Sequence, residues 1–389
     1  MKILHTSDWH LGQKFVSRER EEEHQLALDW LATTIAEQGV EALIVAGDVF
    51  DIGNPPHHAR AMYYGFLRKL RFTGCRHIVI TGGNHDSPQM LNAPRELLQL
   101  LDMHVVGCAS EDVCDEIIVL KNQAGEPECI VAAVPFLRDQ DLRRAISGET
   151  GQERIERIKE GIFKHYQAAA EAVGKVWQQL SGKKKKLNVP VIATGHLYAS
   201  WALASEKQEN IYLGNLENIR AEQFQDVFDY VALGHIHRAQ ALGGLAHVRY
   251  SGSLIPLSFS ETKDDKVVVL LDFDGKKLKE IKELPVPVFR RLKTIDGRLA
   301  EVQERLEAFD DRHKEGLPPW VETIVESDTI VPNLHGLLLD FTKDMHLELL
   351  RSKLNYTHRS LNEQVEETIE LDELEPMEVF LKRCESAGR

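Results

Sequence analysis

Along the first part of the chain, short apolar runs alternate with segments whose apolar residues recur at helical spacing. The short runs predict buried strands, and the helical spacing predicts helices with one face on a core. Alternation of strands and helices favours parallel strands with helices packed on the faces of the sheet. The expected strands are Lys2–Thr6, Ala42–Ala46 and His77–Thr81, and the expected helices are Ser17–Gln38, Pro56–Phe72 and Pro88–Leu101.

After these elements the pattern of the chain changes. Two apolar runs, Glu116–Leu120 and Glu128–Val134, lie too close together for a helix to fit between them, so they predict consecutive strands. A long polar helix, Gln152–Leu180, follows. Together the elements indicate an α/β fold with two facing mixed β-sheets flanked by helices. The later strands are expected at Val189–Thr194, Tyr230–Leu233, His247–Gly252 and Lys266–Phe273.

Two prolines, Pro285 and Pro287, mark a linker at which the composition shifts. The elements beyond it suffice for a small α+β domain, so the chain is expected to divide into residues 1–280 and 285–389. We expect the second domain to cap the first. Its predicted elements are helices at Leu299–Phe309 and Asp344–Leu354 and strands at Val321–Ser327 and Leu334–Asp340.

Five short polar blocks each follow an expected strand. Because loops at the carboxyl ends of strands gather at one edge of a layered α/β fold, the blocks should meet in one site. Their side chains are carboxylates, an amide and imidazoles, a set that suits manganese, iron or zinc better than calcium. The blocks are Asp8-Trp9-His10, Gly47-Asp48, Gly83-Asn84-His85-Asp86, Gly195-His196 and Gly234-His235-Ile236-His237.

The spacing within these blocks has a physical reason. Asp-x-His and His-x-His place two side chains on the same side of an extended segment, so that both reach inward. Asp48 has two carboxylate oxygens and can bridge two cations, which together polarise a phosphate and lower the pKa of a water molecule. Taken singly, each residue has an ordinary explanation, such as a turn-capping aspartate or a buried histidine. The ordered set therefore favours a two-metal phosphoesterase site.

Composition and charge narrow the class of protein. The net charge of −14 argues against a sequence-independent DNA coat, although it allows a DNA enzyme whose metal ions face the phosphates. The five cysteines form no Cys-x-x-Cys pair, which argues against sulfur ligands and favours a reducing compartment. Apolar runs are too short to span a bilayer, and Met1–His5 lacks the pattern of a secretion signal. We therefore expect a cytoplasmic protein without membrane association.

The five blocks resemble those of the calcineurin-like metallophosphoesterase superfamily over residues 1–275. Within it, Lys2–Gly12 and Ala46–Asp51 are similar to the double-strand-break-repair nucleases. This resemblance implies manganese-dependent exonuclease action on duplex DNA and endonuclease action on single strands and hairpins. It also implies a homodimer that partners a coiled-coil ATPase subunit in a heterotetramer. A small-substrate metallophosphatase or nucleotidase is the alternative.

The resemblance also assigns roles to residues of the five blocks. One of them, His85, would not bind metal but would protonate the departing 3′ oxygen of the phosphodiester or stabilise its charge. Seven others would hold two divalent metal ions per chain, with manganese expected. In this pattern Asp8, His10 and His237 hold one metal, Asn84, His196 and His235 hold the other, and Asp48 bridges them.

Two positions near the expected site are less defined. Asp86 either orients the ring of His85 or stabilises a turn, and the sequence favours neither role. Several relatives carry a histidine shortly after the Gly-Asp block, where this sequence has Asp51. The nearest histidines, His57 and His58, are expected to be a solvated pair.

Several surface features suggest partner contacts. The run Lys183–Lys186 is expected to be a solvated loop rather than a DNA contact. The segment Leu361–Arg389 carries nine acidic and three basic residues around an apolar stripe, so it is expected to dock a protein partner. The helices Pro56–Phe72 and Pro88–Leu101 should mostly pack on the sheet, and by resemblance also meet their copies in the homodimer. Arginines whose positions suit a DNA groove are Arg138, Arg143, Arg144, Arg290 and Arg291.

Overall fold

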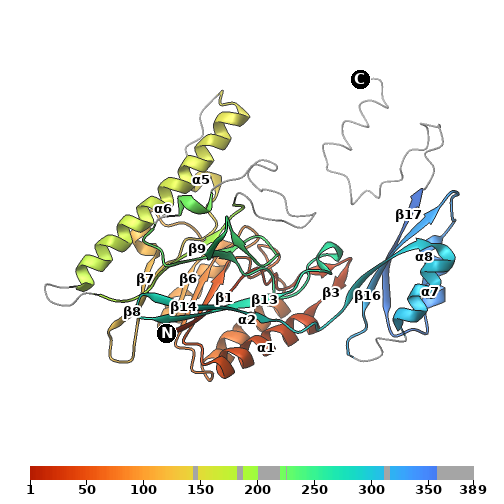
Figure 1. Cartoon of the computed structure of the whole chain (residues 1–389), viewed down its shortest axis with the longest axis horizontal. Helices are drawn as coiled ribbons and strands as arrows, with labels where there is room; N and C mark the ends of the chain where they lie inside the picture. The colour runs from red at the N-terminus through yellow and green to blue at the C-terminus, as the bar shows by residue number, and fades with distance from the viewer. Residues whose placement is uncertain (143–147, 182–186, 200–219, 225, 311–315, 357–389) are drawn as a thin grey trace.

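The computed structural model describes residues 1–142, 148–181, 187–199, 220–224, 226–310 and 316–356. Its larger part contains two six-stranded sheets, and a three-stranded sheet lies at the opposite end of the molecule (Figure 1). The predicted α/β fold with two mixed sheets flanked by helices is confirmed. No helix among the described residues combines the length and the apolar character that crossing a membrane requires.

The first sheet has the strand order β14-β13-β1-β4-β5-β6. Strands β1, β4, β5 and β6 run parallel, β13 lies antiparallel beside β1, and β14 lies antiparallel beside β13 at the edge of the sheet. Helices connect the parallel strands, as parallel neighbours require. The strands are β1 (Lys2–Thr6), β4 (Ala42–Ala46), β5 (His77–Thr81), β6 (Met103–Val106), β13 (Val267–Asp274) and β14 (Lys277–Pro285).

The second sheet has the strand order β11-β12-β10-β9-β8-β7. Strands β8, β9, β10 and β12 run parallel, and β7 and β11 are antiparallel edge strands. Both sheets are therefore mixed, as predicted. The strands are β7 (Ile117–Lys121), β8 (Pro127–Ala132), β9 (Val191–His196), β10 (Tyr230–Gly234), β11 (Gln240–Leu242) and β12 (Leu245–Tyr250).

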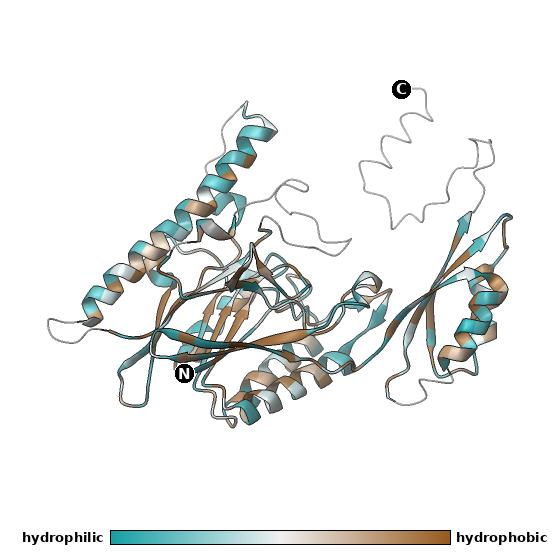
Figure 2. Ribbon diagram, viewed as in Figure 1, coloured by the Kyte–Doolittle hydropathy of each residue, from teal (hydrophilic) through white to brown (hydrophobic). Residues whose placement is uncertain are grey.

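The core is built from alternate side chains of these strands. In β4, Ala42 and Ile44 join the apolar cluster between the two sheets, whereas Leu43 and Val45 pack against helices on the outer face. All five residues of β4 are buried, because both faces of the strand are covered. Figure 2 shows these apolar strands in the centre of the molecule, with the more polar helices outside them.

Helices cover the outer face of each sheet. Helices α1 (Glu21–Gln38) and α2 (His57–Leu70) pack on the first sheet, and the long α6 (Gly151–Ser181) packs on the second. The predicted packing role of α2 is confirmed, since its apolar side chains are buried in the core. These side chains are Met62, Tyr63, Phe66, Leu67 and Leu70.

Two predicted helices differ from those in the structure, one in its first residue and the other in being divided into two. The helix expected from Ser17 begins at Glu21, because β2 (Lys14–Phe15) and β3 (Arg18–Glu19) form a hairpin before it. The helix expected at Pro88–Leu101 is two short helices, with Pro94 between them, where the proline ring and its missing N–H disfavour a continuous helix. The short helices before residue 292 are α3 (Pro88–Asn92), α4 (Arg95–Gln99), α5 (Asp139–Leu142), η1 (Val113–Glu116), η2 (Ala221–Gln223) and η3 (Phe259–Glu261).

Residues 292–356, which we call the capping unit, have their own apolar cluster and a parallel sheet in the order β15-β16-β17. Helices α7 and α8 pack on this sheet (Figure 1). The α+β composition predicted for this part of the chain agrees with these elements. They are β15 (Leu292–Arg298), α7 (Leu299–Asp310), β16 (Trp320–Ser327), α8 (Leu334–Thr342) and β17 (Glu348–Tyr356).

Two predicted elements of the capping unit are wrong. The strand expected at Leu334–Asp340 is helix α8, in which Leu334 and Leu338, four residues apart, both face the core. The helix expected at Asp344–Leu354 is mostly strand β17, which pairs in parallel with β16. A short apolar run does not distinguish a helix from a strand, and here pairing with β16 decides the outcome.

A small aromatic cluster joins the capping unit to the rest of the chain. The ring of Phe15 stacks on that of Trp320 at 5.5 Å and contacts the ring of Phe259 at 5.0 Å. The guanidinium of Arg290 lies 4.4 Å from the centre of the Trp320 ring, and its Nη1 donates to the carbonyl of Pro318 at 2.6 Å. We call this cluster the joint.

Candidate metal centre

The five polar blocks of the sequence lie at the carboxyl ends of β1, β4, β5, β9 and β10. These strands are parallel neighbours within their two sheets, so their ends meet at one edge. Backbone hydrogen bonds join the first two loops, from Asp8 N to Gly47 O and from His10 N to Asp48 O, both at 3.1 Å. The predicted convergence of the blocks is therefore observed.

Four of the candidate ligands have an unusual backbone conformation. The φ angles are 51° at Asp8, 46° at His10, 50° at Asp48 and 96° at His235. Residues with a β-carbon rarely adopt positive φ, and such strain is kept where the surrounding structure holds it and where function requires it. The backbone at this edge is thus shaped to present side chains rather than to continue the strands.

Glycines allow the loops to approach one another closely. A β-carbon on Gly83 would lie 2.1 Å from Oδ1 of Asp48, and one on Gly234 would lie 1.9 Å from the carbonyl oxygen of Ala46. Neither distance is possible between non-bonded atoms, so no other residue fits these positions without displacing a neighbouring loop. Glycine precedes the ligands because the loops touch, and not only because the chain turns.

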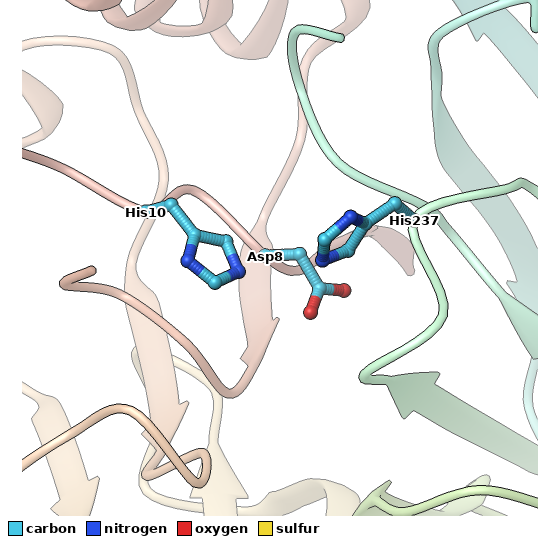
Figure 3. Close-up of side chains that lie close together, drawn as sticks. All are labelled: Asp8, His10 and His237. Carbon is cyan, nitrogen blue, oxygen red and sulfur yellow. The ribbon is translucent and has the colours of Figure 1, made fainter. Parts of the chain in front are cut away.

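The first group of donors consists of Asp8, His10 and His237. One donor atom from each of these side chains lies within 4.8 Å of the other two. Figure 3 shows the carboxylate of Asp8 and the two imidazole rings, which come from two distant segments of the chain. A carboxylate and two imidazoles suit a divalent transition metal.

The second group lies on the other side of Asp48. Donor atoms of Asp8, Asp48 and His196 lie within 4.8 Å of one another. The amide oxygen of Asn84 lies 3.0 Å from Nε2 of His196 and 3.2 Å from Nδ1 of His235. All four side chains predicted for the second metal and its bridge are therefore neighbours.

Asp48 lies between the two groups. Its Oδ2 is 3.5 Å from Nε2 of His10 and 3.1 Å from Nε2 of His196, while its Oδ1 accepts from the backbone N–H of His85 at 2.9 Å. Nε2 of His10 is buried and makes no hydrogen bond. A shared carboxylate oxygen beside an imidazole nitrogen without a hydrogen bond is the arrangement that a pair of cations would complete.

In three of the candidate histidine ligands, Nδ1 lies within hydrogen-bond distance of an acceptor oxygen elsewhere in the fold. Nδ1 of His10 lies 3.0 Å from Oδ1 of Asp51, Nδ1 of His196 lies 2.9 Å from the carbonyl of Ala46, and Nδ1 of His237 lies 3.2 Å from Oε1 of Glu261. The acceptors keep a hydrogen on Nδ1, so that Nε2 is the nitrogen that would bind a metal once it loses its proton. The residues present therefore fit divalent metal ions.

Charge concentrates at this edge of the sheets. Burial lowers the pKa of His10, but the hydrogen bond to Asp51 and the charge of Asp48 outweigh burial and raise the pKa to about 9. Burial likewise lowers the pKa of His196, and the charge of Asp48 raises it to about 9. Burial opposes ionisation of Asp48, yet His196 and His10 hold its pKa well below the usual range. Burial keeps the pKa of His235 low, so its ring is neutral.

His85 is exposed beside the metal centre, with its ring centre 4.8 Å from that of His10. Its Nδ1 lies 2.7 Å from the carbonyl oxygen of Asp51, which can only accept, so Nδ1 carries the hydrogen. Asp51 therefore contacts two histidines, each through a different group. Its side chain contacts His10, and its backbone orients His85.

Asp86 does not orient the ring of His85. Its carboxylate accepts from the backbone N–H groups of Val49 at 3.1 Å, Phe50 at 2.9 Å and Gly83 at 2.9 Å. Of the two roles considered for Asp86, the turn-stabilising one is confirmed. Burial, followed by the charge of Asp48, raises the pKa of Asp86 to about 6.

The arginines expected at a DNA groove differ in their surroundings. Arg290 is buried in the joint, so its guanidinium is used within the fold and is not available to clamp DNA. Arg138 donates from Nη2 to the carbonyl of Asp86 at 3.3 Å, close to the metal centre. Arg291 is exposed, as is His57, whereas His58 is half-buried. The predictions for Arg143, Arg144, Lys183–Lys186 and Leu361–Arg389 lie outside the described residues.

Sequence reasoning does not identify two contact residues of the site, Asp51 and Glu261. In the sequence Asp51 stands out only as a departure from the family pattern, and Glu261 belongs to none of the five blocks. Glu261 is 24 residues from His237 in the chain, so no local spacing links the two. In the sequence Glu261 is only an acidic residue between two expected strands, which does not indicate a contact with His237.

Residues 1–239 match the family described as calcineurin-like phosphoesterase, so the chain is a metallophosphoesterase. Residues 288–387 match the family described as type 5 capsule protein repressor C-terminal domain. The chain belongs to the SbcD family of nuclease subunits. It is 40% identical to the SbcD subunit of the nuclease SbcCD from Escherichia coli strain K12, over 98% of this chain and 92% of the relative.

Two further relatives carry the same name. The Rhodobacter capsulatus protein is 37% identical over 74% of this chain and 70% of its own length. The Bacillus subtilis protein is 32% identical over 70% of this chain and 66% of its own length. Membership of this family supports a nuclease subunit of the phosphodiesterase class, and the phosphoesterase family implies divalent metals.

Proposed function

We propose that this chain is a metal-dependent DNA nuclease subunit that hydrolyses phosphodiester bonds with two divalent metal ions. The observation that carries the proposal is the position of Asp48, whose Oδ2 lies between Nε2 of His10 and Nε2 of His196. A carboxylate oxygen between two imidazoles from different strands fits a bridging ligand. His85 lies next to this bridge and is exposed to a substrate.

The proposed ligands follow the two groups of donors. Two Mn²⁺ ions would supply Lewis-acid chemistry, polarising the phosphate and lowering the pKa of a water molecule. The protein residues hold the donors in place and keep the imidazoles in the correct tautomer. The proposed ligands are Asp8, His10 and His237 for one metal, Asn84, His196 and His235 for the other, and Asp48 for both.

His85 is proposed as the catalytic acid. Its Nδ1 is bonded to the carbonyl of Asp51, so Nε2 is the nitrogen that can meet a substrate. From there it would protonate the departing 3′ oxygen or stabilise its negative charge, a role that commonly contributes about 10²- to 10⁴-fold in rate. Because His85 is not among the proposed ligands, its chemistry is separable from metal binding.

The proposed substrate and partners rest on family membership. We propose exonuclease action on duplex DNA and endonuclease action on single strands and hairpins, in DNA repair, recombination and replication in the cytoplasm. The relatives are named as subunits of SbcCD, which supports an SbcC-type coiled-coil ATPase as partner. The nuclease domain would span residues 1–280 together with the rest of β14 to Pro285, and a DNA-facing capping domain, proposed at 285–389, would follow with an acidic tail that binds the ATPase.

A homodimer within the heterotetramer is also proposed. Near α4, Leu97 and Leu100 are 65% and 81% exposed, and Phe72 after α2 is 87% exposed. Exposed apolar side chains of this size would be covered at an interface. These residues lie in the two segments that the family resemblance suggests for contact with a second copy.

The test uses the purified full-length chain and end-labelled duplex DNA, with and without Mn²⁺ and with and without the ATPase partner. Mn²⁺-dependent shortening of the label is expected, and His85→Gln should reduce it strongly while keeping the metal. A simple aryl phosphate monoester tested in parallel addresses the alternative. If the protein hydrolyses the monoester rapidly and cuts no form of DNA, the nuclease proposal is wrong and a small-substrate metallophosphatase takes its place.

A further inference from the structure

Glu261 contacts the proposed ligand His237 from outside the set of seven ligands. Its carboxylate is buried, with Oε1 3.2 Å from Nδ1 of His237 and Oε2 2.6 Å from Nζ of Lys266. Oε2 also accepts from the backbone N–H of Leu257 at 3.1 Å. A carboxylate with partners on both oxygens cannot rotate without losing them, so it holds the imidazole in one orientation.

Lys266 strengthens this arrangement. Its Nζ donates to Glu261, to the backbone carbonyl of His237 at 2.9 Å and to Oγ of Ser253 at 2.9 Å. The ring and the backbone of His237 are therefore held by the same buried ion pair.

The turn that carries Glu261 also contacts the capping unit. Phe259, two residues earlier in η3, packs against Phe15 at 5.0 Å, and the guanidinium of Arg351 lies 5.5 Å from the centre of its ring. Phe15 in turn stacks on Trp320, the first residue of β16. One short turn thus has a carboxylate on the metal centre and an aromatic ring in the joint.

We propose that Glu261 is a positioning residue of the metal centre. It holds the ring of His237 ready for a cation, and packing of the capping unit on η3 sets the position of Glu261 itself. This role depends on the proposed function, because it requires His237 to be a metal ligand. A change in the joint should then alter the affinity for one of the two metal ions.

The test measures Mn²⁺ binding to metal-free full-length protein by titration calorimetry. Wild type should bind two ions, and Glu261→Gln should bind one of them roughly ten- to a hundredfold more weakly. Glu116→Gln is the matched control, because Glu116 is a fully buried carboxylate bonded to Nε2 of His165 at 2.8 Å, outside the candidate metal centre. It should bind both ions as wild type does.

Two further variants keep the proposal testable if Glu261→Gln does not fold, which thermal unfolding in a chelator would report. Glu261→Asp retains the charge and should recover part of the lost affinity. Trp320→Leu alters the joint without touching a ligand and should weaken the same ion several-fold.

Wild-type affinity for both ions in Glu261→Gln would overturn the positioning role alone. If Glu261→Gln does not fold, wild-type affinity for both ions in Trp320→Leu would overturn it. A wild-type protein that binds no Mn²⁺ would overturn the metal centre and the positioning role together.

Discussion

The two ends of the parallel strands differ sharply, although the strands between them are buried and largely apolar. At the amino ends, Arg76 donates to Glu128 at 2.6 Å and to Glu41 at 2.8 Å, and His77 contacts Glu128 at 2.9 Å. Opposite charges from both sheets are paired there. At the carboxyl ends, aspartates and histidines face one another on a strained backbone, and Nε2 of His10 lacks a hydrogen bond.

This difference shows how one scaffold separates stability from chemistry. At the amino ends opposite charges are paired with one another, whereas the carboxyl ends bring together the donors that the proposed cations would complete. Substitutions at the two ends should therefore have different consequences, and the largest effect is expected at the carboxylate between the two groups of donors.

Asp48→Asn should abolish metal binding, because the bridge between the two groups loses its charge. Cutting of DNA should fall by about a thousandfold or more, corresponding to the several kcal/mol that metal ions supply to the transition state. Elemental analysis after gel filtration measures the metal content. Two bound ions per chain in this variant would contradict the bridging role.

His85→Gln should leave the metal content near that of wild type and lower the cutting rate by about 10²- to 10⁴-fold, as expected for loss of a general acid. Single-turnover cutting of labelled DNA gives the rate, and elemental analysis gives the metal content. Unchanged activity would remove His85 from catalysis.

The affinity for Mn²⁺ should increase with pH. In the metal-free site the pKa values of His10 and His196 are about 9, so a bound cation must displace protons below that pH. The apparent affinity is expected to rise about tenfold per pH unit for each proton released. Calorimetry in buffers of different ionisation enthalpy counts those protons, and a release of none would refute the prediction.

Without metal, the raised pKa values of His10 and His196 predict that the stability of the folded protein decreases with pH, opposite to the Mn²⁺ affinity. In the folded protein the pKa values of His10 and His196 are about 9, above the ordinary histidine value of 6.5. The stabilisation that these two protonated rings add to the free energy of unfolding is therefore fully present below pH 6.5 and is lost as the pH rises to 9. The metal-free protein should therefore unfold at a lower temperature at pH 9 than at pH 6.5. Calorimetric scans in a chelator at both pH values measure this, and an equal or higher unfolding temperature at pH 9 would contradict it.

Glu128→Gln, at the amino ends of the strands, should have the smallest effect. It weakens a partly exposed ion pair with Arg76, which costs about 1 kcal/mol of unfolding free energy after allowance for solvent screening. Urea denaturation measures the loss. Mn²⁺ affinity and cutting should stay at wild-type values, and a drop in either would show that the two ends are not independent.

The strands and ligands that could be predicted are those whose signals are local. The buried run Ala42–Ala46 and the block that follows it are contiguous in the sequence, and sheet geometry then brings the blocks together. Elements decided by distant partners were missed or reversed. Strand β17 is defined by pairing with β16, and α8 by packing in the cluster of the capping unit.

The same reasoning applies to single residues. The contact of Asp86 with Val49, Phe50 and Gly83 depends on how two loops lie, which no spacing reveals. Sequence could therefore propose the ligands but not the groups that orient them. Those groups act across the fold, as Glu261 does on His237.

The close approach at Gly83 and Gly234 limits how this centre can be transferred to another protein. Each loop leaves room for its neighbour only where a β-carbon is missing, so the loops fit as a set and not one by one. A designer who copies the seven donors onto a new pair of sheets without these two glycines would separate the strands and lose the geometry. The two glycines are therefore as necessary to such a design as the seven donors are.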